Sequence, residues 1–397
     1  MITHTSTPSR LRILLVDDEP LVLDGLRRQF RQLRDRWEVS TAIGGELAIA
    51  ELRRGAFDVV VSDMRMPGID GIAVLAAAAE AQPGAVRFIL SGYSEREDLL
   101  RSLGPAHRWL VKPCDLASLQ LLVGRSLELR REISMPEVRQ VMERVVPATS
   151  LPRAIRDLAS DLSAAQPDAG RSLAAITQDP EIGPGMADLA GSLGLMPVGT
   201  DPAGGLLALP PGTVRAIALA WHLHRTCNLR NDTAIWRHGL LVSRLARRIT
   251  AGLPGPEVEM ATAAGLLHDC GRLVLTSLDD TNRIALALER RCSPNLEHAE
   301  RSIFGCDHGL VGAAMLASWG LPDSVVEAVA WHHRPAPGRL DAAMAVHLAD
   351  ALSGAGEAAC IDLGLLSVVG LHHRLQEWEA MAQQERQAIE QRHGTSS

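Results

Sequence analysis

The stretch Leu11-Arg12-Ile13-Leu14-Leu15-Val16-Asp17-Asp18-Glu19 decides the fold, because an apolar run with a single arginine ends directly in three carboxylates. Similar apolar runs occupy residues 57–62, 86–90 and 109–111, with a weaker one at residues 37–41. Such runs are typical of strands buried on both faces. Helix-length segments alternate with them, at residues 21–33, 45–54, 71–81 and 116–131. The alternation predicts an α/β domain, a doubly wound parallel five-stranded sheet with helices on both faces.

Polar side chains stand at the carboxyl ends of these predicted strands, where doubly wound sheets bind their ligands. They are Asp17, Asp18, Asp63, Ser91 and Lys112. Three neighbouring carboxylates repel one another, and Mg²⁺, which binds carboxylate oxygens, relieves that repulsion. Lys112 is the only lysine among 40 basic residues, and its ammonium can pair with a phosphoryl oxygen. The set predicts phosphoryl transfer onto a carboxylate.

Four motifs within residues 10–130 resemble the receiver domain of two-component response regulators. They are Val16-Asp17-Asp18-Glu19, Ser62-Asp63-Met64-Arg65-Met66-Pro67-Gly68, Leu90-Ser91-Gly92 and Val111-Lys112-Pro113. The resemblance implies that Asp63 accepts a phosphoryl group from a sensor histidine kinase. It implies that Mg²⁺ is held by Asp17, Asp18, Asp63 and the backbone carbonyl of Arg65. Ser91 would then follow the phosphoryl group and Lys112 would pair with it. Trp109 stands at the family's switch position, where plain packing explains a tryptophan equally well.

The sequence changes character after residue 130. Residues 131–149 are charged and amphipathic, with a proline at position 136, and predict a helical connector. Beyond residue 150, alanine and leucine recur at helical spacing between prolines and glycines, and strand patterns nearly vanish. We therefore expect a first domain over residues 1–130, the connector, an all-α domain over residues 150–355 and a helical tail over residues 356–397.

Histidines cluster in this second half, which holds twelve of the 14 in the chain. The histidines and nearby aspartates that could bind a metal are His238, His268, Asp269, His308, His332, His333 and Asp350. Imidazole with carboxylate suits a first-row divalent metal. The groups fall on different predicted helices and could line one cavity between them. Adjacent His268 and Asp269 would point about 100° apart on a helix, so spacing alone does not place them on one ion.

The order His238, His268-Asp269, Asp350 resembles the HD phosphohydrolase superfamily, and the other histidines match extra ligands of its HD-GYP branch. Two departures count against that branch: no Gly-Tyr-Pro follows His333, and Arg272 replaces an expected lysine. The closer resemblance, over residues 148–355, is to the HDOD output domain, a relative usually regarded as non-catalytic. Its motifs are Trp236-Arg237-His238, Phe304-Gly305-Cys306-Asp307-His308, Trp319-Gly320-Leu321-Pro322 and Trp331-His332-His333.

The composition limits the remaining classes. The net charge of −7 without a basic arm argues against DNA binding, and no apolar run reaches the ~18 residues that span a bilayer. Six scattered cysteines are typical of reduced thiols in the cytoplasm. We expect a cytoplasmic response regulator whose output domain binds an unidentified protein, with a homodimer as one form. The alternative is a metal-dependent HD-type phosphodiesterase for a cyclic dinucleotide or nucleotide, controlled by the first domain.

Overall fold

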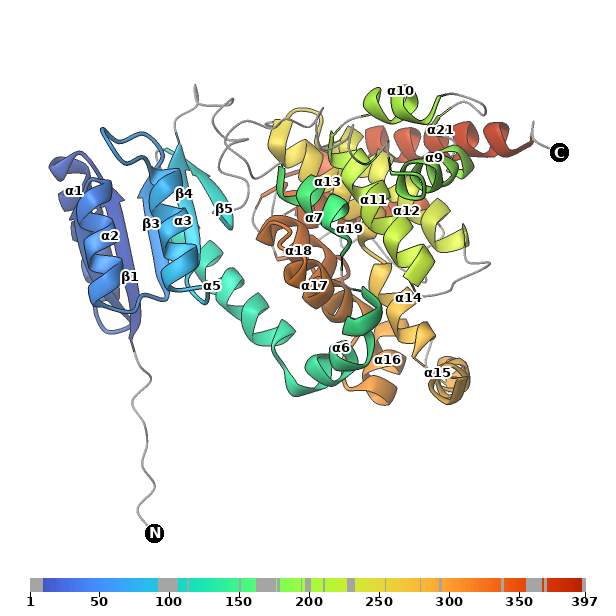
Figure 1. Ribbon diagram of the computed structural model, residues 1–397, viewed down its shortest axis with the longest axis horizontal. Helices are drawn as coiled ribbons and strands as arrows, with labels where there is room; N and C mark the ends of the chain where they lie inside the picture. The colour runs from blue at the N-terminus through green and yellow to red at the C-terminus, as the bar shows by residue number, and fades with distance from the viewer. Residues whose placement is uncertain are drawn as a thin grey trace, which may run out of the picture. The chain divides into compact units, whose positions relative to one another are not determined.

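The structure is a computed structural model, shown in Figure 1. It describes residues 10–91, 106–112, 114–149, 151–161, 176, 179–193, 195–196, 201–209, 211–226, 233–253, 255–278, 280–292, 295–336, 339–354, 366–367 and 370–394. The chain divides into two compact units, the first running to Glu128 and the second beginning at Leu129. The boundary falls inside helix α5, Leu116–Ile133.

The first unit contains the predicted parallel α/β sheet. Its strands are β1 Leu11–Asp17, β2 Trp37–Ile43, β3 Val59–Asp63, β4 Val86–Ser91 and β5 Arg108–Val111, in the order β2-β1-β3-β4-β5. All neighbouring pairs are parallel. Because the chain turns back across β1 between β2 and β3, the carboxyl ends of β1 and β3 form the switch point where such sheets bind ligands.

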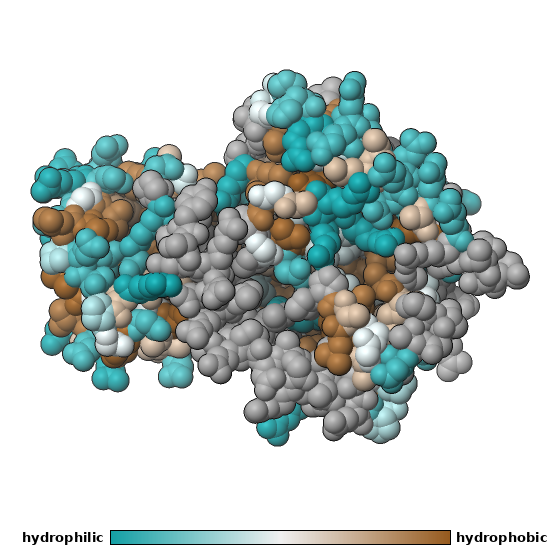
Figure 2. Space-filling model, turned by 90° about the horizontal axis from the view of Figure 1, so that it is seen from above, coloured by the Kyte–Doolittle hydropathy of each residue, from teal (hydrophilic) through white to brown (hydrophobic). Residues whose placement is uncertain are grey.

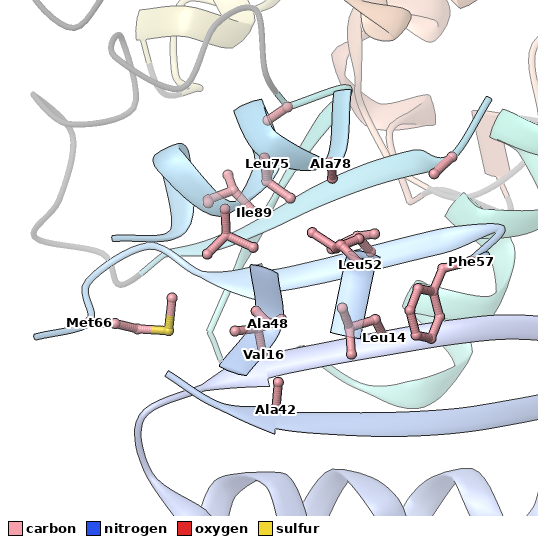
Figure 3. Packing of buried hydrophobic residues seen from close by; sticks show 14 of the residues in the cluster. Leu14, Val16, Ala42, Ala48, Leu52, Phe57, Met66, Leu75, Ala78 and Ile89 are labelled. Carbon is pink, nitrogen blue, oxygen red and sulfur yellow. The ribbon is translucent and has the colours of Figure 1, made fainter. Parts of the chain in front are cut away.

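Two apolar layers hold the sheet between its helices. Helices α2 Gly45–Arg54 and α3 Gly71–Ala81 cover one face, where Leu52, Leu75 and Ala78 pack on Leu14 and Ile89 (Figure 3). Helices α1 Pro20–Phe30 and α5 cover the other, and a short 3₁₀ turn, Arg31–Leu33, follows α1. The strands are therefore buried on both faces, as their near-continuous apolar sequence predicts.

All regular secondary structure in the described residues of the second unit is helical. Its helices are α6 Pro136–Thr149, α7 Arg153–Asp161, α9 Ile182–Ser192, α10 Pro202–Leu207, α11 Pro211–Thr226, α12 Thr233–Ile249, α13 Gly255–Leu267, α14 Cys270–Ser277, α15 Asp280–Cys292, α16 Leu296–Phe304, α17 His308–Ser318, α18 Asp323–Ala330, α19 Ala342–Ser353, a 3₁₀ turn His372–Arg374, and α21 Leu375–Gly394. Helices α12, α13 and α19 pack against one another at its centre. This arrangement confirms the predicted helical second half.

Both ends of the second unit are packed. Val138 and Val141 of α6, from the predicted connector, are buried, and α6 contacts α17 and α11. Trp378 of α21 is fully buried, and Glu385 on the same helix pairs with Arg248 of α12 at 3.1 Å. The helix at the chain's end therefore packs on the body of this unit instead of standing apart as a polar tail.

The surface has no extended apolar face in the view of Figure 2, where hydrophilic residues interrupt the hydrophobic ones across the coloured area. Among the described residues, the most exposed large hydrophobic one is Leu21, at 83%. Among the helices of the described ranges, none combines the length and hydropathy that a bilayer crossing requires.

Candidate functional site

Three carboxylates meet at the carboxyl edge of the sheet. Asp17 ends β1 and Asp63 ends β3, and each offers an oxygen within 4.8 Å of one from Asp18, in the loop after β1. Asp17 is 1% exposed and Asp63 8% exposed. Helix α3 can start close to this edge because residue 71 is glycine, where a Cβ atom would lie 1.9 Å from the carbonyl oxygen of Asp63.

Lys112 joins two of these carboxylates. Its Nζ lies 2.5 Å from Asp63 Oδ1 and 3.1 Å from Asp17 Oδ2. The backbone fixes the lysine at this place, since its N–H donates to the carbonyl of Ser91 at 2.8 Å. The lone lysine of the sequence thus lies at the predicted phosphoryl site.

The charges at this edge shift one another's protonation. Burial raises the pKa of Asp63 above its usual value, outweighing the opposing effect of the Lys112 ammonium. Burial lowers the pKa of Lys112, but Asp63 and Asp17 outweigh it and leave that pKa above its usual value. Oxygen ligands of this kind fit Mg²⁺, which favours the ionised form of every carboxylate it binds.

Two of the remaining predicted residues, Asp18 and Arg65, line a cleft at this edge. Its other lining residues are Met64, Met66, Pro67, Asp70 and Ile72, and its volume is about 500 Å³. Ser91 is buried at the end of β4, and its Oγ has no hydrogen-bond partner among the described residues. The side chain of Trp109, on β5, lies outside the described part of the chain, as do Gly92 and Pro113 of the motifs.

A second group of ligand-type side chains comes from helices of the second unit and from the breaks between them. His238 lies on α12 and Asp350 on α19, while His308 begins α17. The pair His268-Asp269 lies in the break between α13 and α14, not on one helix. The expected divergence of about 100° therefore does not apply, because the backbone leaves the helix at Asp269 and both side chains reach the same pocket.

These side chains form two adjoining clusters. In the first, His238 Nε2 lies 3.2 Å from His268 Nε2 and 3.0 Å from Asp350 Oδ1. In the second, His308 Nε2 lies 3.3 Å from His332 Nε2 and 3.2 Å from His333 Nε2. The sequence-predicted set thus converges in one pocket, with each cluster inside ligand distance.

Asp269 stands between the clusters. Its Oδ2 lies 3.7 Å from His268 Nε2, and its Oδ1 lies 3.4 Å from His308 Nε2. Arg272 donates to Oδ2 at 2.8 Å, so the arginine at the expected lysine position contacts this carboxylate. A carboxylate with one oxygen toward each cluster can bridge two cations.

The hydrogen bonds of the rings assign their tautomers. His268 and His332 direct Nδ1 to the carbonyls of Gly265 and Val329, each at 2.8 Å, and carbonyls only accept. His308 directs Nδ1 to Glu300 Oε2 at 2.6 Å. The Nε2 lone pairs of His308 and His332 therefore face each other at 3.3 Å. Such a contact is favourable only with a proton on one ring or a metal cation between them.

Burial controls the charges in this pocket. It lowers the pKa of His268, takes that of His332 well below its usual value, and lowers that of His333 to about 4. For Asp269, burial is outweighed by the surrounding His268, Arg272 and His308, so its pKa lies well below its usual value. These shifts favour neutral imidazole at His268, His332 and His333 and ionised carboxylate at Asp269, the forms that bind metals. At His308 burial is outweighed by Glu300, which raises the pKa to about 9, so a metal there would displace a proton.

Contacts outside the two clusters hold them in place; His347 belongs to the sequence motif that ends in Asp350, whereas no motif indicated Glu300 or Glu132. Glu300, eight residues before His308, accepts from its ring. His347 Nδ1 donates to the carbonyl of His332 at 2.7 Å. Glu132, in the last turn of α5, accepts from Trp331 Nε1 at 2.8 Å and from Arg334 at 3.1 Å, so it flanks the His332-His333 pair on both sides. No periodic spacing links Glu132 or Glu300 to the histidines, and only the fold brings them together.

Two family models match this chain. The response regulator receiver domain matches residues 13–123, and the HDOD domain matches residues 208–335. Both matches fall on stretches whose motifs carried the resemblances. The HDOD match ends before Asp350, which the structure nevertheless places in the histidine pocket.

Curated relatives match a quarter to a third of this chain. The hydrogenase transcriptional regulatory protein HoxA of Cupriavidus necator is 35% identical over 103 residues, which cover 25% of this chain and 21% of HoxA. The transcriptional regulatory protein PrrA of Mycobacterium leprae is 36% identical over 131 residues, 33% of this chain and 54% of PrrA. The chain thus spans about half, or less, of the length of these relatives.

Solved structures match a similar share of the chain. The signal receiver domain of an HD domain-containing protein from Pseudomonas fluorescens is 28% identical, with 30% of this chain and 96% of that chain covered and a TM-score of 0.29. The response regulator TrrA from Thermotoga maritima, in complex with Mg²⁺-BeF, is 32% identical, covering 29% and 97%, with a TM-score of 0.26.

Proposed function

Since the chain combines a response regulator receiver domain with an HDOD domain, we propose that it is a phosphorylation-controlled regulator with Asp63 as phosphoacceptor. The observation that carries this proposal is the contact of Lys112 with both Asp63 and Asp17, beside a third carboxylate. A sensor histidine kinase as phosphoryl donor, a cytoplasmic location and a protein partner or second copy for the HDOD domain belong to the same proposal.

The chemistry follows from the residues at the sheet edge. A carboxylate oxygen of Asp63 attacks phosphorus of a phosphohistidine, the phosphorus–nitrogen bond breaks, and the kinase histidine leaves with the electron pair. Lys112, already 2.5 Å from Asp63, pairs with a phosphoryl oxygen, and the Ser91 hydroxyl can donate to another. Mg²⁺, held by Asp17, Asp18, Asp63 and the Arg65 carbonyl, would neutralise charge on the transferring group. A shifted pairing of Lys112 and Ser91 would then select the second receiver state.

Intact-mass measurement tests the phosphoacceptor. After incubation with acetyl phosphate and Mg²⁺, we expect one phosphoryl adduct per chain, absent in Asp63→Asn and retained in Asp24→Asn, which changes an exposed aspartate of α1. An undiminished adduct in Asp63→Asn would overturn the assignment.

The histidine pocket supports a second candidate function, a metal-dependent phosphodiesterase of the HD type. The main support for it is the short distance between the Nε2 atoms of His308 and His332, together with the position of Asp269 between the two clusters. First-row divalent ions would be held by His238, His268, Asp269 and Asp350 on one side and by Asp269, His308, His332 and His333 on the other. When bound, such ions supply Lewis-acid activation of water and of a phosphate oxygen.

Metal analysis with a hydrolysis screen separates this candidate from a purely protein-binding domain. We expect about two ions per chain after reconstitution with Mn²⁺, and turnover of a cyclic dinucleotide or nucleotide that His268→Ala abolishes. His298→Ala, a matched change on α16 outside the clusters, should leave both unchanged. Less than about 0.1 ion per chain with no turnover would sink the enzyme and leave the protein-binding function.

A further inference from the structure

Glu300 is a buried carboxylate of α16 that no motif of the pocket includes. Its side chain is 1% exposed. Its Oε2 accepts the backbone N–H of His308 at 2.9 Å and the Nδ1–H of the same residue at 2.6 Å. Because one oxygen binds both the backbone and the ring of His308, it fixes the imidazole relative to the start of α17.

A neighbouring ion pair strengthens this junction. Arg301 donates through Nε and Nη2 to Asp307 Oδ2, at 2.8 and 2.5 Å. Asp307 Oδ1 accepts the N–H of Leu310 at 2.9 Å and so caps α17. The last turn of α16 therefore holds two consecutive residues, Asp307 and His308, at the N-terminus of α17. The ring of His308 has little freedom to turn away from the pocket.

The support of His308 differs in kind from that of the other pinned rings. His268 and His332 donate to neutral carbonyls of Gly265 and Val329, three residues earlier in each case. Such local bonds follow from the helix ends themselves. Glu300 instead brings a full charge into the protein interior, which is costly unless that charge is used. A carboxylate on Nδ1 orients the ring and raises the basicity of its Nε2 as a ligand.

We infer that Glu300 is the positioning residue that makes His308 a ligand of one metal ion in this pocket. The inference rests on the proposed metal-dependent function and names the residue that sets one of its two clusters. Glu300 hydrogen-bonds to His308 of the second cluster and, among the described residues, to no other member of either cluster. Its removal should therefore weaken the ion near His308, His332 and His333 and spare the ion near His238, His268 and Asp350.

Zn²⁺ titration of the metal-stripped full chain against a chromophoric chelator tests the inference. On a His238→Ala background, which leaves the His308 cluster as the main site, we expect Glu300→Gln to weaken Zn²⁺ binding by about tenfold. Glu300→Leu, which also removes the acceptor, should weaken it by about 100-fold. The matched control is Glu289→Gln on α15, outside the contacts that support His308, and it should leave the affinity unchanged.

Metal binding at the first cluster, which Glu300 does not contact, shows whether a Glu300 variant is still folded. On a His333→Ala background, the site of His238, His268 and Asp350 should bind Zn²⁺ equally well with and without the Glu300→Leu substitution. Combining Glu300→Gln with His308→Ala should cost no more affinity than His308→Ala alone, because residues that act through one another are non-additive. Nitrogen-15 spectra of the histidine rings, recorded above the pKa of about 9 of His308, should show its neutral Nδ1–H form in the metal-free chain and the loss of that form in Glu300→Leu.

The outcomes separate the inference from the function on which it rests. Two bound ions that Glu300→Gln and Glu300→Leu both leave at full affinity would overturn the role of Glu300 and keep the metal pocket. Equal weakening at both sites would assign Glu300 to general folding and also overturn the inference. Binding of less than about 0.1 Zn²⁺ per chain in the unmodified protein would overturn the metal pocket itself, and the inference with it.

Discussion

Each of the two pockets brings together groups that repel one another, carboxylates in the first and ring nitrogens in the second, and the repulsion is relieved in different ways. At the sheet edge the carboxylates of Asp17 and Asp63 share the ammonium of Lys112, so the protein carries its own counter-charge. In the helical unit the Nε2 atoms of His308 and His332 face each other at 3.3 Å. In the first pocket an ammonium group of the protein already balances the carboxylates. The second pocket requires an added cation between its ring nitrogens, either a proton or a metal ion. This difference can be tested from both sides.

The largest effect should come from Asp269, the carboxylate between the two histidine clusters. Asp269→Asn keeps the size of the side chain and removes the charge shared by both clusters. We expect metal affinity to fall by more than about 100-fold at both sites, exceeding the loss typical of an outer contact. Inductively coupled plasma mass spectrometry of the reconstituted chain measures this. Phosphorylation at Asp63 should be unchanged, and retention of two ions would contradict the bridging role.

A backbone contact should give the next largest effect. A Cβ atom on Gly271 would lie 1.9 Å from the carbonyl oxygen of His308, so Gly271→Ala must push α14 away from α17. We expect the second unit to lose about 3 kcal/mol of unfolding free energy in urea. Gly191→Ala is the matched control, because a Cβ there meets nothing within 4 Å, and it should stabilise α9 by about 0.5 to 1 kcal/mol. Equal stability of the two variants would show that the helices can separate freely.

Lys112→Arg should have a smaller effect that is confined to the first pocket. Arginine keeps the charge but replaces a compact ammonium on a flexible stem by a planar fork, which cannot reach Asp63 and Asp17 in the same geometry. We expect the rate of phosphorylation by acetyl phosphate to fall about tenfold, equivalent to about 1.4 kcal/mol. Time-resolved intact-mass measurement gives the rate, with Arg54→Lys as an exposed control. An unchanged rate would mean that only charge matters at this position.

The smallest effect is the pH dependence of stability that comes from the histidines of the second pocket. The pKa of His333 is lowered to about 4 by burial and by His308, against an ordinary value of 6.5. Between these values the unfolded chain binds a proton that the folded chain does not, so stability must fall as the pH drops from 6.5 to 4. The urea midpoint of the metal-free second unit should decrease through this window.

The urea midpoint should also fall at high pH, on the basic limb of the same pH curve. For His308, burial is outweighed by Glu300, and the pKa rises to about 9. Its stabilisation is complete below pH 6.5 and is lost as the pH rises toward 9. His333→Asn should reduce the acid limb, to which the lowered pKa values of His268 and His332 also contribute, and Glu300→Gln should reduce the basic limb. A metal-free urea midpoint that is constant from pH 4 to 9 would contradict both assignments.

The sequence predicted the first pocket more fully than the second, and the reason is geometric. Parallel strands must end together, so carboxylates that follow separate strands meet at one edge, as Asp17 and Asp63 do. Helices α2 and α3 also begin and end where the apolar spacing predicted. No comparable rule says which residues of separate helices will lie next to one another. The break at His268-Asp269 and the supports from Glu300 and Glu132 depend on long-range packing that no spacing encodes.

The position of Glu132 also determines how the helical unit can be isolated for study. A chain that begins at residue 150, the predicted start of the second domain, would lack Glu132 and all of α6. Trp331 would lose its carboxylate partner beside His332, and the apolar surface covered by Val138 and Val141 would face water. Such a fragment could lose metal binding for reasons unrelated to its ligands. A fragment that begins at Leu129 keeps these contacts. Its metal content can therefore be compared fairly with that of the whole protein.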